Sequence, residues 1–530
     1  MKFSHIYKLP SVFTLSVVAF GILTLVAGCH SLKRTPQEVD ILVINGKVYL
    51  GDMSGEQNLD IGICEDRICL LAQTSEHNVI AKQIIDARGQ VVSPGFIDPH
   101  THSLEELLSK DKNHNLNYLT QGVTTVINGN DGDGSYKIKE TASKLETNGI
   151  GTNVGLLAGH NKIRTAVMGR ENRYASQYEI QQMRQLVASA MKEGALGLST
   201  GLYYVPGSYA ATEEVVELAK AAAEYGGIYD THLRDESTFN IGFLSALDEA
   251  MDITRQAGIH LHLAHIKALG VDSWGLSHQA VDKIQQAINS GFSISADQYP
   301  WLASGTKLHS AIMPKWVMAD SKSAFYNRLN DPKLQSRLKT EIAENIRRRG
   351  GPESLLVTAF KDESMVGKTL LDLSKEYAMS PAKTAMQLVQ LGDIRVASFN
   401  MSENDVEHFM QQDWVVTSSD GTNGHPRKYA SFPKKFQTYV AEKNVLNLDE
   451  FISRSSGKTA KLLGLKDRGE IKQGYMADVI IWTPEMFEAK ANFSKWDTYS
   501  TGISTVLVNG QVVIQNGQFQ QILAGRFIAK

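Results

Sequence analysis

Pro94-Gly95-Phe96-Ile97-Asp98-Pro99-His100-Thr101-His102 is the stretch on which the fold prediction turns, because an apolar strand runs directly into two histidines. In an extended chain, residues two apart point to the same side, so His100 and His102 would share one face. Two imidazoles on one face can chelate a metal ion. The pair by itself fits polar residues at an ordinary strand end equally well, so the surrounding fold has to decide.

After this stretch, short apolar runs that end in polar residues alternate with helical stretches such as 212–225 and 244–257. This alternation predicts an α/β protein with a parallel sheet. We expect strands at 91–97, 123–128, 152–158, 195–200, 227–231, 259–264, 292–296 and 414–418. Eight such units favour a (β/α)8 TIM-like barrel. The gap at about 301–413 is too long for an ordinary connection and predicts an insertion before the last barrel strand.

Both ends of the globular part follow another pattern. Short apolar runs near residue 45 are separated by Asn45-Gly46 and Gly51-Asp52, which are typical hairpin turns, and Asn509-Gly510 repeats the pattern near the other end. Antiparallel strands are expected at both ends. They would form one small β-sandwich domain, from 39–92 and 455–530, beside a barrel domain at 93–454.

The amino-terminal segment resembles a bacterial lipoprotein signal. Two lysines precede an uncharged stretch at 9–28, small residues end it, and Cys29 follows. We expect a signal peptide at 1–28, lipidation of Cys29, and a polar tether at 29–38 that holds the protein to a membrane. The location would be the cell envelope, on the periplasmic side of the outer membrane. An uncleaved transmembrane anchor is the alternative, because the apolar stretch is about long enough to span a bilayer.

The amino-acid composition and net charge restrict the classes of molecule that the protein is expected to bind. The 530 residues are 42% hydrophobic and 21% charged, as in globular proteins, and the formal net charge is -3. No long basic run provides the positive surface that a nucleic-acid-binding protein needs. A small-molecule partner is therefore expected.

Further residues that can bind metal end other predicted strands. His232, His265 and Asp420 each come at the carboxyl end of a strand, which is the barrel face where active sites form. They would converge there with the two histidines of 94–102 around a divalent metal. His262 lies in the same strand as His265 and is a competing ligand on spacing alone.

The chain resembles the amidohydrolase superfamily, and within it the D-aminoacylases or N-acyl-D-amino-acid deacylases, over about 39–525. The resemblance is carried by Gly95-Phe96-Ile97-Asp98 before His100-Thr101-His102, Gly122-Val123-Thr124-Thr125-Val126, Gly194-Ala195-Leu196-Gly197-Leu198-Ser199-Thr200-Gly201-Leu202, Thr231-His232-Leu233-Arg234-Asp235-Glu236, His265-Ile266-Lys267, Ser419-Asp420-Gly421 and Gly474-Tyr475-Met476-Ala477-Asp478-Val479. It implies one or two zinc ions at the barrel mouth, held by His100, His102, His232, His265 and Asp420. It favours His265 over His262, and it implies that Asp420 is also the catalytic base.

One position departs from the family. D-aminoacylases commonly place a metal-bridging cysteine after the second strand, where this chain has Asp131 in Gly129-Asn130-Asp131-Gly132. A carboxylate has two oxygens and could also bridge two metal ions. The alternative is that Asp131 is only a turn residue before Gly132.

By the same resemblance, Lys267, Tyr204 and Tyr299 contact the substrate, although spacing alone would equally allow packed side chains. Arg234 could hold a substrate carboxylate through two parallel hydrogen bonds, or pair locally with Asp235 or Glu236.

The expected reaction is hydrolysis of the amide of an N-acyl-D-amino acid, with Asp420 taking a proton from metal-activated water and returning it to the departing amine. Hydrolysis of a cyclic amide or a D-residue dipeptide is the alternative, because fold does not separate these substrates. A lipid-anchored binding protein without catalysis is a more distant one. Stereochemistry, acyl and side-chain preference, and oligomeric state are not fixed by the sequence.

Cys64 and Cys69 flank a predicted tight turn. If Asp66-Arg67 forms it, the two cysteines face each other at a Cα separation of about 4.5 Å, which a disulfide accepts. Two free thiols in a small sheet are the alternative.

Overall fold

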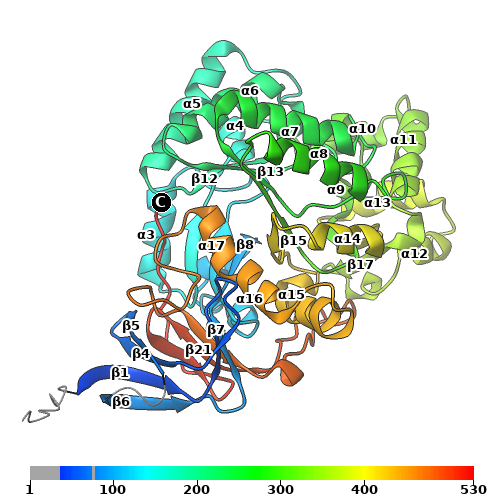
Figure 1. Ribbon diagram of the computed structural model, residues 1–530. Helices are drawn as coiled ribbons and strands as arrows, with labels where there is room; N and C mark the ends of the chain where they lie inside the picture. The colour runs from blue at the N-terminus through cyan, green and yellow to red at the C-terminus, as the bar shows by residue number, and fades with distance from the viewer. Residues whose placement is uncertain (1–35, 74–77) are drawn as a thin grey trace, which may run out of the picture.

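A closed barrel of parallel strands forms the centre of the computed structural model, which describes residues 36–73 and 78–530 (Figure 1). Its strands are β8 (Phe96–Thr101), β9 (Val123–Asn128), β10 (Asn153–Leu156) with β11 (Ala158–Gly159), β12 (Gly197–Gly201), β13 (Ile228–His232), β14 (His260–Leu263), β15 (Ile294–Gln298) and β19 (Val415–Thr417). Successive strands pair in parallel, and a parallel bridge from Thr101 to Gly421 closes the ring. The third strand is in two pieces, so the predicted (β/α)8 barrel is confirmed.

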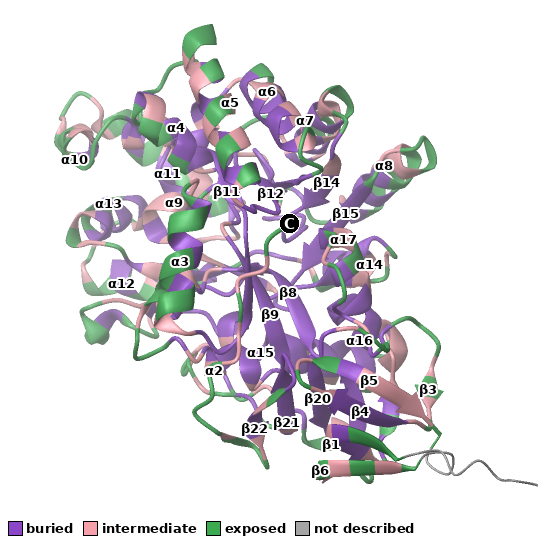
Figure 2. Ribbon diagram, turned by 90° about the vertical axis from the view of Figure 1, so that its left-hand side faces the viewer, coloured by how far each residue is buried: buried purple, intermediate pink, exposed green. Residues whose placement is uncertain are grey.

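Helices surround the barrel with their apolar faces inward, and Figure 2 shows the buried strands at the centre. They include α3 (Ile138–Asn148), α4 (His160–Met168), α5 (Gln177–Lys192), α6 (Thr212–Ala223), α7 (Phe243–Ala257), α8 (Ser277–Asn289), α14 (Glu403–Met410) and α16 (Leu448–Ser455). In α5, Ser176 and Glu179 form a reciprocal capping box that starts the helix. Ile180, Met183 and Val187 then recur at helical spacing and pack into the core.

Two small sheets lie beside the barrel, one from the N-terminal end alone and one from both chain ends. The first has the order β5 (Arg67–Ala72), β4 (Asp60–Cys64), β1 (Gln37–Ile44) and β6 (Val79–Asp86). The second has the order β23 (Gln518–Phe519), β22 (Gln511–Gln515), β21 (Ile503–Val508), β20, β7, β2 (Lys47–Tyr49) and β3 (Glu56–Gln57). The contact between the ends is direct, because β20 (Val479–Trp482) pairs antiparallel with β7 (Val91–Pro94). Apolar side chains from both ends, such as Val43 and Leu507, share one core. The predicted sandwich of both chain ends is therefore present.

Not all of 455–530 lies in these sheets. Helix α17 (Gly457–Leu463) packs against β8 of the barrel. At the chain end, Val154 N donates to Arg526 O and Ile528 N donates to Val154 O, so the tail runs along β10. The final residues therefore complete the barrel wall.

Two local predictions were wrong, one of a strand and one of a hairpin turn. The single strand expected at 91–97 is split at Gly95 into β7, in a small sheet, and β8, in the barrel. A side chain at Gly95 would clash, since an added Cβ would lie 2.2 Å from Thr124 Oγ1. Asn45-Gly46 does not close a hairpin, because β1 (Gln37–Ile44) and β2 (Lys47–Tyr49) enter different sheets. The turn predicted at Asn509-Gly510 is confirmed.

The hairpin of β4 (Asp60–Cys64) and β5 (Arg67–Ala72) carries a disulfide between Cys64 and Cys69, whose Cα atoms are 5.7 Å apart. The turn lies one residue earlier than predicted, because Cys64 pairs with Arg67 and Glu65 takes a positive φ of 54°. The register shifts between Gly62, which pairs with Leu70, and Ile63, which pairs with Ile68. Cys69 is therefore the extra residue of a bulge and bonds diagonally to Cys64.

The stretch between β15 and β19 forms a separate layer over one side of the barrel mouth. It contains an antiparallel sheet of β16 (Ala303–Lys307), β17 (Leu355–Ala359) and β18 (Arg395–Phe399). Its helices are α9 (Leu308–Ile312), α10 (Lys322–Asn330), α11 (Gln335–Arg348), α12 (Leu370–Glu376) and α13 (Pro381–Leu391). These elements share their own apolar core, which includes Leu338, Ile342 and Leu388.

No helix within the described part of the chain is both long and apolar enough to cross a membrane. The predicted signal peptide, Cys29 and most of the tether at 29–38 lie outside the described residues.

Candidate metal centre

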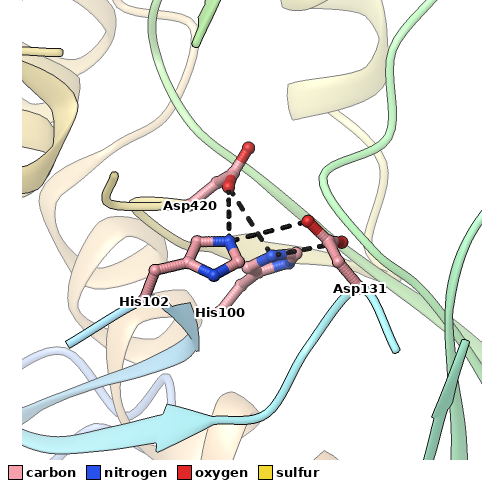
Figure 3. Close-up of side chains that lie close together, drawn as sticks. All are labelled: His100, His102, Asp131 and Asp420. Atoms are coloured by element: carbon pink, nitrogen blue, oxygen red, sulfur yellow. Dashed lines mark ion pairs between the residues drawn. The ribbon is translucent and has the colours of Figure 1, made fainter. Parts of the chain in front are cut away.

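The six predicted ligands come together at the carboxyl ends of the barrel strands. His100 lies in β8 and His102 just beyond it, while Asp131 follows β9. The other three come from β13, β14 and β19, where His232 is the last residue of its strand and His265 and Asp420 follow theirs. Figure 3 shows four of the side chains pointing toward one another. Parallel strands all end on the same face, so residues far apart in sequence meet there.

The ligand atoms are at chelating distance from one another. His102 Nε2 lies 3.2 Å from Asp420 Oδ1 and 3.6 Å from Asp131 Oδ2. His100 Nε2 lies 3.6 Å from both Asp131 Oδ1 and Asp420 Oδ1. These spacings suit several atoms that surround one ion about 2 Å away.

Asp131 belongs to two potential metal groups. One contains His100, His102 and Asp420, and the other contains His232 and His265. Asp131 Oδ1 lies 3.5 Å from His232 Nδ1 and 3.3 Å from His265 Nε2, while Oδ2 faces His102. This geometry favours a bridging carboxylate over a residue that serves only the turn.

Three of the six residues have left-handed backbone conformations. The φ angles are 57° at Asp131, 37° at His265 and 46° at Asp420. Residues other than glycine rarely adopt such angles, and they do so mostly where the surrounding structure requires a particular side-chain direction. Each bend lies just after a strand and turns a ligand toward the cluster.

The donor set fits a divalent cation. His100 Nε2, Asp131 Oδ1 and His232 Nδ1 are buried and have no hydrogen-bond partner among the described residues. Buried polar atoms are normally satisfied, so unpaired lone pairs that face one point indicate a ligand. Imidazole nitrogens with carboxylate oxygens are suitable for zinc.

The electrostatics of the cluster keep its carboxylates ionised. Burial alone would raise the pKa of Asp131, but His100 and His265 hold it well below its ordinary value. Burial likewise opposes ionisation of Asp420, yet Arg427 and the histidines lower its pKa. Arg427 Nη1 lies 2.8 Å from Asp420 Oδ2. Both carboxylates therefore carry the negative charge that a cation requires.

The competing histidine, His262, lies outside this cluster. It belongs to a separate buried group with Asp230 and Asp297, in which His262 Nε2 is 3.0 Å from Asp297 Oδ2. The same Asp297 oxygen lies 3.6 Å from His100 Nδ1. Asp297 therefore contacts a candidate ligand on the side away from the metal, where a carboxylate can orient the imidazole.

Two of the predicted substrate-contacting residues line the cavity above the cluster, which has a volume of ≈ 1180 Å³. Tyr204 packs its ring 4.7 Å from the His232 ring. Lys267 Nζ lies 2.8 Å from His265 Nδ1 and donates to Glu236 Oε1 at 2.7 Å. Lys267 thus contacts both the cavity and a candidate ligand.

The other two predicted substrate-contacting residues, Tyr299 and Arg234, do not line this cavity. Tyr299 is 2% exposed, and its ring packs between Lys267 and Arg427. Arg234 forms a bidentate ion pair with Glu249, in which Arg234 Nε lies 2.8 Å from Glu249 Oε2. It does not pair with its sequence neighbours Asp235 and Glu236. The structure thus places Arg234 outside the lining of this cavity with its charge paired to Glu249, and a contact with substrate stays a prediction.

Sequence reasoning gave Glu236 and Arg427 no role at the metal centre. Glu236 Oε1 lies 3.2 Å from His265 Nδ1, and Oε2 lies 3.6 Å from His232 Nε2, so one carboxylate contacts two candidate ligands. Arg427 lies seven residues after Asp420, in the first turn of α15 (Arg427–Lys435). Each of the two follows a candidate ligand closely in the sequence, and this spacing could have indicated them.

A barrel of this topology with a buried His/Asp cluster defines the class of the protein as a metal-binding hydrolase. The profile of the amidohydrolase family matches residues 83–312 and 366–514, and the chain belongs to this family. It is similar to the D-aminoacylase of Alcaligenes xylosoxydans xylosoxydans, with 29% identity over 521 residues that cover 93% of this chain and 98% of the relative.

Solved structures agree. A D-aminoacylase structure that addresses the functional role of its binuclear metal center has a TM-score of 0.80 and 27% identity, and covers 93% of this chain and 100% of that one. The N-acyl-D-glutamate deacylase of Bordetella bronchiseptica, complexed with zinc and a phosphonate inhibitor, has a TM-score of 0.79 and 25% identity over the same shares. The expected family and fold are thereby confirmed.

Proposed function

We propose that the protein hydrolyses the amide bond of N-acyl-D-amino acids and uses one or two divalent metal ions, preferably zinc. The observation that carries this proposal is the shared position of Asp131 between two His/Asp groups at the mouth of the barrel. The similar D-aminoacylase and N-acyl-D-glutamate deacylase support the choice of substrate class.

His100, His102, Asp131, His232, His265 and Asp420 would hold the metal. A divalent cation bound there would lower the pKa of a water molecule and polarise the amide carbonyl. Asp420 is placed to take the proton from the attacking water and to deliver it to the departing amine. Arg427, at 2.8 Å, orients the Asp420 carboxylate. Glu236 and Lys267 fix the rings of His232 and His265.

The insertion layer contributes the opposite wall of the cavity, with residues such as Lys307 and Lys315. A substrate bound between this wall and the cluster would be partly shielded from water, which strengthens every electrostatic contact in the site. Tyr204 and Lys267 are the cavity-lining residues proposed to contact it.

The test is hydrolysis of matched pairs of D and L N-acetyl amino acids by purified protein loaded with zinc, with a hydantoin as a cyclic control. We expect release of the free D-amino acid, loss of activity on chelation, and recovery on adding zinc back. No release from any D substrate by metal-loaded protein, or hydrolysis of the hydantoin alone, would overturn the proposal.

We also propose that Cys29 carries the lipid that anchors the protein in the cell envelope, on the periplasmic side of the outer membrane. The sequence around Cys29 is the support for this proposal.

A further inference from the structure

Two cations from the insertion face the cavity above the candidate metal centre. Lys315 begins the short 3-10 helix η2 (Lys315–Met318), which lies between α9 and α10 in the sequence, and Arg349 follows α11. Both line the cavity. Both also fall within residues 313–365, which the amidohydrolase family profile leaves unmatched.

Neither cation forms an ion pair with a carboxylate within residues 36–73 and 78–530. Arg349 is 3% exposed and donates to three neutral oxygens: Ala311 O at 2.8 Å, Tyr203 OH at 3.2 Å and Ser398 Oγ at 3.3 Å. Lys315 Nζ lies 3.4 Å from Ser310 O and 3.4 Å from the centre of the Tyr203 ring.

Several other basic side chains of the same cavity are neutralised. Lys267 pairs with Glu236, Lys307 with Asp393, and Arg427 with Asp420. Exposed Lys322 and Arg170 also line the cavity and are hydrated, whereas half-buried Arg395 has no carboxylate partner among the described residues and donates to Asn423 O at 3.0 Å. Lys315 and Arg349 are partly or wholly removed from water and have no carboxylate partner among the described residues, which is costly unless an anion arrives. They differ from Arg395 because both contact one residue, Tyr203.

Tyr203 contacts both cations, because its hydroxyl accepts from Arg349 Nη2 at 3.2 Å and the centre of its ring lies 3.4 Å from Lys315 Nζ. The Tyr203 ring also packs 5.6 Å from the His232 ring. The two cations are thus separated from the candidate metal centre by one aromatic ring.

Lys315 and Arg349 therefore lie farther from the candidate metal centre than the cations that contact it. The α-carboxylate of an N-acyl amino acid is only two bonds from the amide nitrogen, so a cation that holds it must lie beside the metal, as Lys267 and Arg427 do. Lys315 and Arg349 lie further out and would meet a group further along the substrate.

We propose that Lys315 and Arg349 form a subsite for a second carboxylate of the substrate. This inference depends on the proposed deacylase function and narrows its substrate class to N-acyl-D-amino acids with two carboxylates. The second carboxylate belongs either to an acidic amino-acid side chain or to a dicarboxylic acyl group, and both present the same chemistry to the two cations.

The test compares kcat/KM for N-acetyl-D-glutamate, N-succinyl-D-methionine and N-acetyl-D-methionine. We expect the wild type to favour at least one dicarboxylate over N-acetyl-D-methionine, and the favoured compound identifies which end carries the second charge. Lys315→Met should lower that preference ratio by roughly ten- to hundredfold, as expected when a charged hydrogen-bond partner is lost.

Controls separate charge from structure. Lys315→Arg should keep the preference, and Arg349→Lys should retain part of it, because each keeps the cation. Lys339→Met removes an exposed lysine of the same insertion outside the cavity and should leave the ratio unchanged. The subsite is refuted if wild type shows no dicarboxylate preference, or if Lys315→Met lowers kcat/KM for all three substrates by one factor. Failure of wild type to cleave any of the three would instead refute the deacylase function itself.

Discussion

Asp420 combines two tasks, because its Oδ1 faces two candidate metal-binding histidines while its Oδ2 faces Arg427. Asp420→Asn keeps an oxygen for the metal but cannot carry a proton at neutral pH. We expect kcat to fall by about 10²- to 10⁴-fold with metal content nearly intact. Metal analysis beside kinetics checks this, with Asp413→Asn, at an exposed position, as control. Near-normal turnover would exclude Asp420 as the base.

Asp297 contacts the Nδ1 atom of His100, which is the ring nitrogen that does not face the candidate metal ligands, and we expect it to orient this ring. Because Asp297 Oδ2 lies 3.6 Å from His100 Nδ1, Asp297→Asn should weaken zinc binding by roughly ten- to hundredfold, as is common when a carboxylate that orients a metal-binding histidine is lost. Competition against a chelating dye measures the affinity. Asp248→Asn, on the exposed face of α7, is the matched control. Unchanged affinity would show that His100 is positioned without Asp297.

At the scale of elements, helix α15 carries an unusual buried charge. Lys435 is fully buried, its Nζ has no hydrogen-bond partner among the described residues, and burial with nearby Arg454 lowers its pKa to about 7. Between pH 7 and about 10 the unfolded chain therefore holds the proton and the folded chain does not, so stability should rise with pH across this window.

Lys435→Met removes the charge and keeps the apolar stem. We expect it to raise the unfolding free energy at pH 7 by on the order of 3 kcal/mol, and to flatten the rise between pH 7 and 10. Urea denaturation at several pH values measures both. Lys434→Met, on the less buried side of α15, should change little. A destabilised Lys435→Met protein would contradict the assignment.

The hairpin of β4 and β5 should contain no free thiol. Titration of denatured, unreduced protein that lacks Cys29 should find none, and two would refute the bond between Cys64 and Cys69. Because the loop is short, replacing both cysteines with serine should cost only about 2 kcal/mol.

At the scale of the whole molecule, the proposed anchor is tested in cells. Labelling with a fatty-acid analogue should tag the wild type, while Cys29→Ser should be untagged and leave the membrane fraction. Cys64→Ser serves as the control for loss of a cysteine and should remain tagged. Persistent labelling of Cys29→Ser would defeat the proposal.

The sequence by itself determined the barrel and most of the candidate metal-binding residues. Alternating strands and helices predicted the parallel sheet, and five of the six candidate ligands could be found because each comes at a strand end, whereas Asp131 was found through the family resemblance. This works because strand direction alone decides which end of a parallel barrel a residue occupies. Spacing could not choose between His262 and His265, and there the family resemblance supplied the prediction.

Only the tertiary structure decided what depends on side-chain partners distant in sequence. Arg234 proved to be paired with Glu249, Arg427 came to face Asp420, and the Asn45-Gly46 turn led between two sheets. The unpaired state of Lys315 and Arg349 was likewise invisible, because a local pattern shows a charge but not what neutralises it. Neutralisation depends on contacts across the fold, and these arise only when the barrel and its insertion pack together.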